Sequence, residues 1–445
     1  MLDKTGQQGK GFDLRTCLRR VSLAMVLAMS LRIFQFFPVL SQLQQAWYGL
    51  CILGLFVAYP CWKLKEGLRF SHYEIYLPVM MLVEVSLNAG QANRVFGQPL
   101  LYGILSQRWI LSVGIWLLFA QGLRHGKIRL ADVEGAILYL AWGTYFLYTA
   151  MRMFLNPGNF SSITGFVAGE GSEASFMING TFVLFGVFYF ALQGLRTGRW
   201  KYYLVAAILF PQTLSGGGRG ATVFLALTLI FFAYRFRGWR RGTMTALKSA
   251  GIGFVLTGML YLISPAQVTK TVAHFADVFV VLGGSISEDP SANIRVFDVL
   301  SATPYIVRHP WLGSGTFSAH WSKSQVEVLN HDFDPSDIGL IGSVYSFGIL
   351  GTMLFLYQYR FAWLNIRKLP AQCQSPLLDA TKAMLLYTMF SSVETSMFVW
   401  SADFIAFMVV LFGAIAANWG ILGNLRENEA ARGYISPIGT VLVAE

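Results

Sequence analysis

The sequence predicts an all-α polytopic membrane protein, and three observations support that class. Hydrophobic residues make up 55% of the 445 residues, charged residues only 13%, and the mean hydropathy is +0.52. Soluble proteins average about 25% charged residues. Long apolar runs, each near the roughly 20 residues that a membrane-spanning helix needs, recur along the whole chain. This composition excludes an ordinary soluble domain.

About twelve runs have the length and composition of membrane-spanning helices. The seventh and eighth are short and flank Ser215–Gly220, so they could instead form a broken or re-entrant pair. The candidate spans are, in order, Val21–Leu40, Trp47–Trp62, Tyr73–Ala89, Trp109–Leu123, Ala131–Met151, Ala174–Gln193, Tyr202–Leu214, Ala221–Arg235, Ala250–Ser264, Ile338–Tyr359, Ala380–Trp400 and Ala402–Leu422.

Lysine and arginine are concentrated on alternate connectors, which predicts the orientation because basic loops stay in the cytoplasm. A twelve-span arrangement then puts both termini in the cytoplasm and the longest polar segment outside. The net charge of +11 follows from this asymmetry, so it is no sign of nucleic-acid binding. The basic groups are Lys4, Lys10, Arg15, Arg19 and Arg20 in the tail, and Lys63/Lys65/Arg69, Arg124/Lys127/Arg129, Arg196/Arg199/Lys201, Arg235/Arg237/Arg240/Arg241 and Arg360/Arg367/Lys368 in the connectors.

The same pattern divides the chain into five segments. We expect a cytoplasmic tail at 1–20, spans one to nine within 21–264, a large outer loop at 265–337, spans ten to twelve within 338–422, and a second cytoplasmic tail at 423–445. Long loops are uncommon and often functional, so the outer loop is the first place to look for a site. The four cysteines lie in spans or on the inner side, which predicts neither a disulfide framework nor a zinc site.

A glycine-rich segment, Ser215–Gly220, joins the seventh and eighth spans on the outer side. Successive glycines, including Gly217 and Gly218, let backbone N–H groups converge on an anion, and Arg219 adds a two-pronged donor. A plain turn between two helices would have the same composition. The segment lacks the Lys-Ser/Thr of a P-loop and faces away from cytoplasmic ATP. Anion binding and a simple turn both remain open.

Within the outer loop, residues 289–302 are predicted to form an amphipathic helix, because Ile294, Phe297 and Leu300 recur at helical spacing. Arg295 lies on the opposite side from Phe297. Its simplest role is an ion pair on the helix surface with Asp298, three residues on. A second arginine, Arg308, precedes an aromatic and glycine-rich turn.

The loop ends in a histidine followed by acids, His331 to Asp337. A histidine beside carboxylates suits a general base, because the acid orients and polarises the imidazole. His331, Asp332 and Asp334 could also bind a divalent cation, but their spacing defines no metal site. His320 is a spare histidine, assigned to packing or to substrate binding.

Arg32, Glu84 and Glu394 are the clear cases of charge inside the predicted spans. A charge within a membrane is costly and therefore implies function by default. The simpler interpretation is a charge satisfied by a neighbouring helix or by snorkelling. Glu84 and Glu394 lie toward the outer halves of their spans, whereas a proton-coupled transporter would place acids near the midplane.

Three segments together resemble the O-antigen ligase and polysaccharide polymerase superfamily of bacterial envelope glycosyltransferases. They are Thr213–Ala221, with its Ser-x-Arg-Gly-like pattern; Asn293–Arg295 through Pro310–Gly315, similar to Arg-x(n)-Pro-x-x-Gly-x-Gly; and His331–Gly342 followed by Tyr345–Gly351. The third is more similar to the exopolysaccharide polymerases. Ligases usually show His-Asn before the span, whereas this chain has Asn330-His331-Asp332, which leaves the base open between His331 and Asp337.

The resemblance implies a GT-C-like architecture and metal-independent, inverting transfer of a sugar chain from a polyprenyl diphosphate to an acceptor hydroxyl. The transfer that the resemblance implies needs no cofactor or nucleotide. Arg219 and Arg295 would bind the diphosphate, with Arg152 and Arg308 as substitutes. His331 or Asp337 would take the proton. The substrate-binding candidates are Gly217, Gly218, His320 and Asp332.

The leading hypothesis is a polymerase of lipid-linked repeat units of an exopolysaccharide or O-antigen in the bacterial inner membrane. A ligase that transfers finished glycan to lipid A core or protein uses the same chemistry. A flippase or transporter is a different class, disfavoured by the single outer loop and the lack of visible inverted repeats. A receptor would not need arginines near one glycine turn. Expected partners are the lipid-linked donor, the acceptor, the bilayer, and chain-length regulator and flippase proteins, without nucleic acid.

Overall fold

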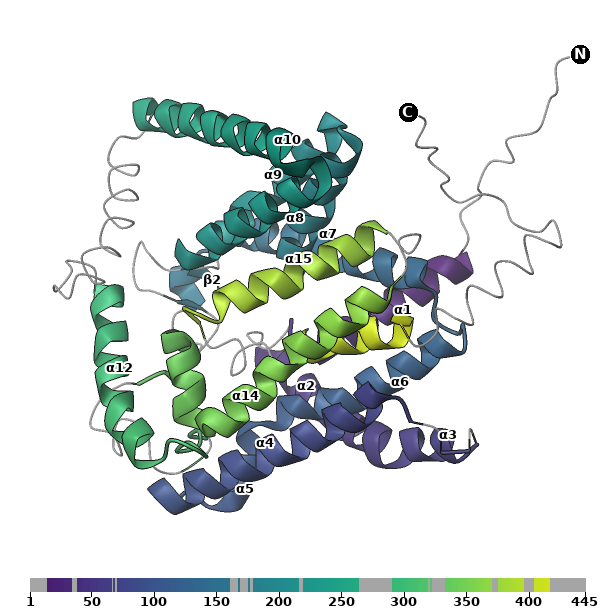
Figure 1. Ribbon diagram of the computed structural model, residues 1–445, viewed down its shortest axis with the longest axis vertical. Coiled ribbons are helices and arrows are strands. Elements are labelled where there is room, and N and C mark those ends of the chain that lie inside the picture. Colours follow the sequence, from purple (N-terminus) through teal and green to yellow (C-terminus); the bar gives the residue numbers. More distant parts are fainter. Residues whose placement is uncertain are drawn as a thin grey trace, which may run out of the picture.

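The structure is a computed structural model, and among the residues that it describes the regular elements are helical apart from one short strand pair (Figure 1). The all-α class is therefore confirmed. Val167–Ala168 (β1) pairs antiparallel with Ser175–Phe176 (β2). The structure describes residues 14–33, 38–65, 67–68, 70–160, 167–168, 175–176, 179–215, 219–263, 290–318, 321, 333–369, 375–395 and 404–416.

The helices follow one another closely along the chain. In order they are α1 (Leu14–Ser30), α2 (Pro38–Leu53), the π-helical η1 (Gly54–Ala58), α3 (Tyr59–Lys65), α4 (His72–Phe96), α5 (Leu100–Ser106), η2 (Arg108–Ser112), α6 (Val113–Arg124), α7 (Leu130–Phe154), η3 (Pro157–Phe160), α8 (Thr181–Thr197), α9 (Trp200–Ser215), α10 (Arg219–Ile263), α12 (Pro290–Arg308), η5 (Pro335–Ile338), α14 (Gly339–Lys368) and α15 (Pro376–Ser391). A further apolar helix covers Phe404–Ala416.

Several helices have the length and composition of membrane spans. Three qualify within the described residues, Gln42–Lys65, Gly220–Thr245 and Pro335–Lys368. A fourth is added if Leu100–Ser106 and Ile110–Arg124, which meet at a bend of 59°, are counted as one broken span. These helices support a membrane protein. The total of twelve spans stays a prediction.

The structure moves several predicted span boundaries. The first span was expected to be continuous over Val21–Leu40, but α1 ends at Ser30 and α2 begins at Pro38. Between them Arg32 adopts a left-handed backbone with φ of 55°. The predicted spans Ala174–Gln193 and Ala380–Trp400 are also shortened, because α8 begins at Thr181 and α15 ends at Ser391. Hydropathy sums apolar character over a window, so it does not register where the backbone turns.

Helix α10 includes the predicted eighth and ninth spans, which are separated by a break at Gly238. At this break the Arg237 side chain donates to the carbonyl of Leu195, at the end of α8, at 3.1 Å. Helix α9 packs against both α8 and α10. Figure 1 shows the two arms of α10 folded beside α8 and α9. The start of α10 at Arg219 is therefore at the opposite end of the first arm from Gly238.

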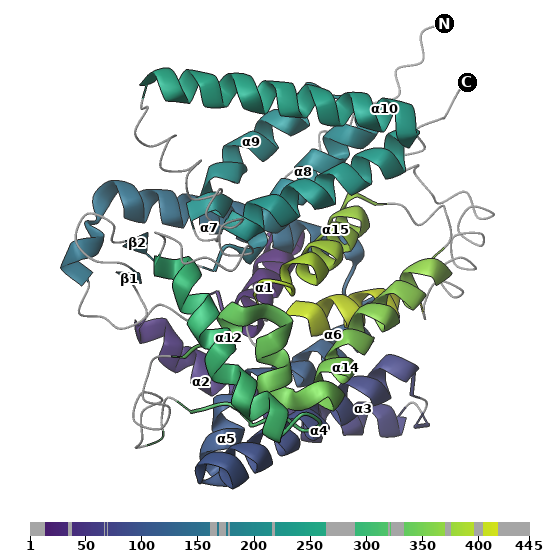
Figure 2. The same ribbon diagram turned by 60° about the vertical axis from the view of Figure 1, so that its left-hand side comes forward.

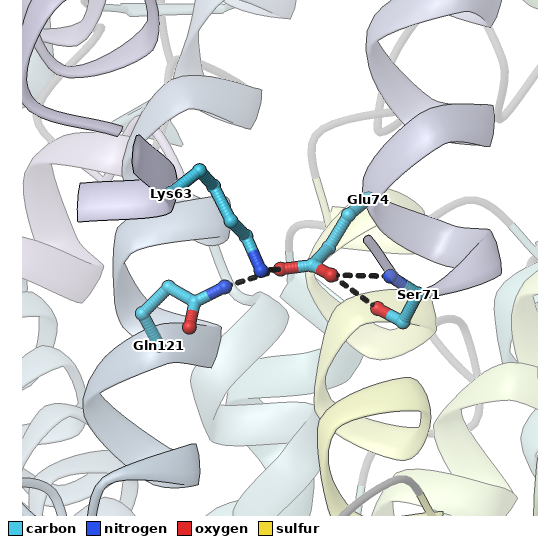
Figure 3. Close-up of polar contacts among 4 residues, drawn as sticks. All are labelled: Lys63, Ser71, Glu74 and Gln121. Carbon is cyan, nitrogen blue, oxygen red and sulfur yellow. Dashed lines mark hydrogen bonds and ion pairs between the residues drawn. The ribbon is translucent and has the colours of Figure 1, made fainter. Parts of the chain in front are cut away.

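A fully buried ion pair joins α3, α4 and α6 (Figure 3). The Nζ of Lys63 lies 2.6 Å from Oε1 of Glu74, and neither side chain has any exposed surface. The backbone N–H and hydroxyl of Ser71 donate to Oε2 at 2.5 and 2.6 Å, and the Gln121 amide donates to Oε1. The sequence placed Lys63 on a basic cytoplasmic connector. In the structure it is instead part of the core, because Glu74 neutralises its charge there.

Glu84 is also completely buried, on α4 against Gly351 of α14. Within the described part of the chain its two carboxylate oxygens have no hydrogen-bond partner. Arg32 is partly buried in the turn after α1. Glu84 is therefore buried within the helix bundle, and among the described residues no neighbouring charge satisfies it.

Charged groups gather at both ends of α15. Near its first turn, Asp379 pairs with Arg196 at the end of α8, with Nη2 and Oδ2 2.8 Å apart. Just after its last turn lies Glu394. A helix of 16 residues is about 24 Å long, so these two carboxylates lie at opposite ends of the bundle. The end that carries Glu394 is where helix α12 lies, beside the start of α14 (Figures 1 and 2).

Candidate functional site

The central contact of the candidate site is an ion pair between Arg295 and Glu394. Nη1 of Arg295 lies 2.5 Å from Oε1 of Glu394, and the two residues are 99 positions apart in the sequence. The predicted surface pair with Asp298 is wrong, because Asp298 is only 2% exposed and the ion pair of Arg295 is made with Glu394. The predicted helix over 289–302 is confirmed as α12, which extends to Arg308.

The amphipathic pattern of α12 explains why Arg295 points toward the rest of the protein. Phe297, Leu300 and Val307 are strongly exposed, at 64%, 61% and 72%. Ala302, on the other side of the helix, is buried beside Tyr345 of α14. Positions 295 and 302 are seven residues apart, two turns of a helix, and therefore share this inner face. The helix thus directs the guanidinium of Arg295 inward.

The second contact of Glu394 is with the start of α10. Its carboxylate lies directly against Gly220, where a β-carbon would overlap both Oε2 and the carboxyl carbon. The first N–H groups of a helix have no partner within the helix and favour an anion. Glu394 therefore places a negative charge between Arg295 and the N-terminus of α10. Arg219 is the first residue of this helix, while Gly217 and Gly218 and the side chain of Arg219 lie outside what the structure describes.

Asp337 lies at the same end of the bundle, in η5. It is close enough to Arg295 and Glu394 to interact with both electrostatically. Asp334 caps this short helix, since its Oδ1 accepts a hydrogen bond of 2.8 Å from the backbone N–H of Ser336. Gly339, the next residue after η5, lies against the backbone of Ser392 and Val393. The start of α14 and the turn that carries Glu394 are therefore packed together.

A glycine-rich joint fixes the end of α12 to α14. Helix α14 is interrupted at Gly348, where φ is 67°, and the segment 310–315 fits into the break. The N–H groups of Ile349 and Leu350 donate to the carbonyls of Pro310 and Trp311, at 2.8 and 3.2 Å. The segment after α12 donates in return: the N–H groups of Ser314 and Gly315 donate to the carbonyls of Tyr345 and Ser346, at 2.7 and 3.1 Å.

Glycine is required on both sides of this joint. Gly313 also has a left-handed backbone, with φ of 70°, and a β-carbon on it would lie 2.5 Å from the backbone nitrogen of Gly348. A β-carbon on Gly348 would overlap the backbone of Trp311. Only glycine adopts such φ values without strain and allows so close an approach. The two sequence segments Pro310–Gly315 and Tyr345–Gly351 are therefore parts of one structural unit.

The chain that leaves the joint is anchored to the end of α4. The N–H and hydroxyl of Thr316 both donate to Oδ1 of Asn88, at 3.0 and 2.8 Å. The N–H of Ser318 donates to Oε1 of Gln98 at 2.9 Å. The sequence did not single out Asn88 or Gln98, because neither is charged and neither lies in a recognisable motif. They hold the segment that follows the joint in place.

The remaining predicted residues are dispersed or lie outside the described residues. Arg152 is exposed in the last turn of α7. Arg308 is exposed at the far end of α12, about 20 Å from Arg295 along a helix with a rise of 1.5 Å per residue. His320, His331 and Asp332 cannot be placed, since they lie in segments that the structure does not describe. Where the structure does describe the chain, it contains no cluster of three or more metal-ligating side chains.

Glu394 is the main site residue that sequence reasoning missed. It stood out as an acid within an apolar run, and the simpler interpretation was a charge satisfied by a neighbour or by snorkelling. That neighbour turns out to be Arg295, itself a predicted site residue. Because the partner is distant in sequence, no local pattern could connect the two.

The fold and the site together define a helical membrane protein with a charged cluster at one end of its bundle. Its described charges come from α12, η5 and the turn after α15, and the cluster lies against Gly220 at the start of α10. Residues 204–356 match the model of a family described as O-antigen ligase. The match confirms the predicted resemblance to the O-antigen ligase and polysaccharide polymerase superfamily, and it supports a transferase function of the ligase or polymerase type. The matched residues include Arg219, Arg295 and Asp337 but not Glu394. No curated protein matches the chain.

Proposed function

We propose that this protein is a glycosyltransferase that extends a polyprenyl-diphosphate-linked glycan at the outer face of the bacterial inner membrane. The donor and acceptor are lipid-linked repeat units of an exopolysaccharide or O-antigen. The proposal includes a GT-C-like arrangement of about twelve spans with both termini in the cytoplasm. The observation that carries it is the position of Arg295, which pairs at one end of the bundle with the Glu394 carboxylate that lies against Gly220 in the first turn of α10.

The site has the charge that a diphosphate leaving group requires. In the transfer, the acceptor hydroxyl attacks the anomeric carbon, the bond from that carbon to the diphosphate oxygen breaks, and the configuration inverts. Negative charge then develops on the leaving diphosphate. An arginine and the free N–H groups of a helix stabilise such charge without a metal ion. Arg295 and Arg219 fill this role.

The proton of the acceptor hydroxyl must pass to a base beside the anomeric carbon. His331 or Asp337 takes this role. Asp337 is the described candidate, and its proximity to Arg295 and Glu394 supports a position next to the diphosphate. Gly217, Gly218, His320 and Asp332 complete the proposed substrate contacts.

A ligase is the second candidate, because the family description names that activity and the same charges would serve it. A flippase is less well supported. A transporter binds its substrate near the bilayer midplane, whereas the charged cluster here lies at one end of α15.

The decisive experiment uses the full-length protein in liposomes with a lipid-linked oligosaccharide, EDTA and no nucleotide. A ladder of longer lipid-linked glycans identifies a polymerase. Transfer to a supplied second acceptor identifies a ligase. Movement of the lipid between leaflets without a new glycosidic bond identifies a flippase and contradicts the proposal.

Two variants test the proposed diphosphate contacts. Arg295→Ala and Arg219→Ala should each reduce transfer by at least about 100-fold, the usual effect of removing one group that stabilises developing negative charge. Arg360→Ala is a suitable control, since Arg360 is exposed on α14 in a predicted cytoplasmic connector. All three proteins should insert in the membrane in equal amounts. Normal polymer from either of the first two variants would contradict the proposed contacts.

A further inference from the structure

We propose that Glu394 is an internal counter-ion that occupies the diphosphate position of the empty site and gives it up when the donor binds. It acts as a positioning residue for Arg295, holding the guanidinium beside the N-terminus of α10 until the diphosphate replaces the carboxylate. This inference rests on the proposed function, because it assigns the anion that Arg295 binds during the reaction.

The two oxygens of Glu394 make the two contacts that an anion would make in this site. Oε1 accepts from Arg295 and Oε2 lies against Gly220 in the first turn of α10. A phosphate group with several oxygens could meet the same two partners. The lack of a side chain at Gly220 creates the room, and in the structure the carboxylate fills it.

The exposure of the pair allows exchange with a ligand. The side chains of Arg295 and Glu394 are 37% and 23% exposed, whereas those of Lys63 and Glu74 are both 0% exposed. The Lys63 pair is inaccessible and holds three helices together. The Arg295 pair can be reached from solvent, so an incoming anion can compete for the guanidinium.

The backbone around Glu394 also suits a side chain that moves. Helix α15 ends at Ser391, and Glu394 lies in the turn that follows. The N–H groups of Glu394 and Thr395 both donate to the carbonyl of Ser391, at 3.1 and 2.8 Å. The backbone of the turn is therefore fixed, while the carboxylate can swing away by rotation about its side-chain bonds alone.

Electrostatic interactions favour the replacement of the Glu394 carboxylate by the diphosphate. Without an anion, the positive charge of Arg295 would lie beside the positive end of α10, an unfavourable arrangement that Glu394 relieves. A diphosphate carries more negative charge than one carboxylate and offers more acceptor oxygens, so it forms stronger contacts with the same partners. Once both anions are nearby they repel each other, which moves the carboxylate out.

The first test is the affinity of the full-length protein, in detergent, for a polyprenyl diphosphate without sugar. Glu394→Gln keeps the size of the side chain and removes its charge, so the variant should bind this lipid about two- to fivefold more tightly, as expected for loss of a competing ion pair. In transfer assays its KM for the donor should fall by a similar factor, with kcat changed less than twofold. A purely structural role would not tighten binding.

Two further variants control this measurement. Asp379→Asn removes a carboxylate at the other end of α15 and should leave the affinity unchanged. Arg295→Gln combined with Glu394→Gln should lose the gain, because the competing contact runs through Arg295. Unchanged or weaker binding by a folded Glu394→Gln variant would overturn the inference.

A second measurement needs no substitution. Carbodiimide labelling of Glu394 in the wild-type protein, followed by mass spectrometry, should increase when the polyprenyl diphosphate is added, because the carboxylate is displaced into solvent. Equal or lower labelling would overturn the inference even if every variant failed to fold. If the wild-type protein bound no polyprenyl diphosphate at all, the proposed function would fall together with the inference.

Discussion

Gly220, in the first turn of α10, lies directly against the carboxylate of Glu394 and leaves no room there for a β-carbon. This contact brings the glycine-rich connector and the turn after α15 to one place, although the two lie far apart in the sequence. Arg295 approaches the same carboxylate from α12. The position of the candidate site depends on this meeting of three segments.

The Gly220→Ala variant should therefore lose activity while remaining folded. Its methyl group would fill the space beside the first turn of α10 that the diphosphate is proposed to occupy, and we expect transfer to fall by about tenfold or more, equivalent to about 1.4 kcal/mol of barrier. Gly143→Ala in α7 is the matched control, because nothing lies within 4 Å of a β-carbon at that position. Wild-type transfer rates for Gly220→Ala would show that the contact is dispensable.

The glycine joint makes a prediction about stability. Gly348→Ala should lower the melting temperature of the purified protein by several degrees, because alanine there has an unfavourable φ and overlaps the backbone of Trp311. The left-handed conformation alone costs about 1–2 kcal/mol. Gly90→Ala in α4, where a β-carbon meets nothing within 4 Å, should not lower the melting temperature. Equal melting temperatures for the two variants would contradict the requirement for glycine in the break of α14.

The buried pair of Lys63 and Glu74 predicts coupled effects of mutation. Lys63→Met or Glu74→Gln alone leaves one charge buried without its partner and should destabilise the protein by about 3–5 kcal/mol. The double variant removes both charges and should recover a large part of that loss. Denaturation of the four proteins in detergent measures the coupling free energy. Simple additivity of the two single effects would argue against a direct interaction.

Much of the architecture could be predicted from local sequence. The helical class, the helix that carries Arg295, and the resemblance of 204–356 to the ligase and polymerase superfamily all rest on short-range patterns. The boundaries near Ser30, Thr181 and Ser391 could not be predicted in this way, because apolar residues continue past the point where each helix ends or begins.

The candidate site could be predicted only in part. Arg219 and Arg295 stood out because arginines beside glycines and on an amphipathic helix are locally recognisable. Glu394 was recognisable only as an unexplained acid, and its relation to Arg295 spans 99 residues. The burial of Lys63 was missed for the same reason, since its partner Glu74 lies on the following helix and nothing around Lys63 itself indicates a core position.

The sequence by itself determined that this chain is an apolar, helical membrane protein with one long polar segment, because composition and periodicity act over a few turns of the backbone. Only the tertiary structure decided which charges meet. Arg295 pairs with Glu394, and the carboxylate of Glu394 lies against Gly220, because α10, α12 and the end of α15 meet at one end of the bundle. Ion pairs and close backbone contacts depend on distances of a few ångströms between segments, and no local pattern encodes those distances.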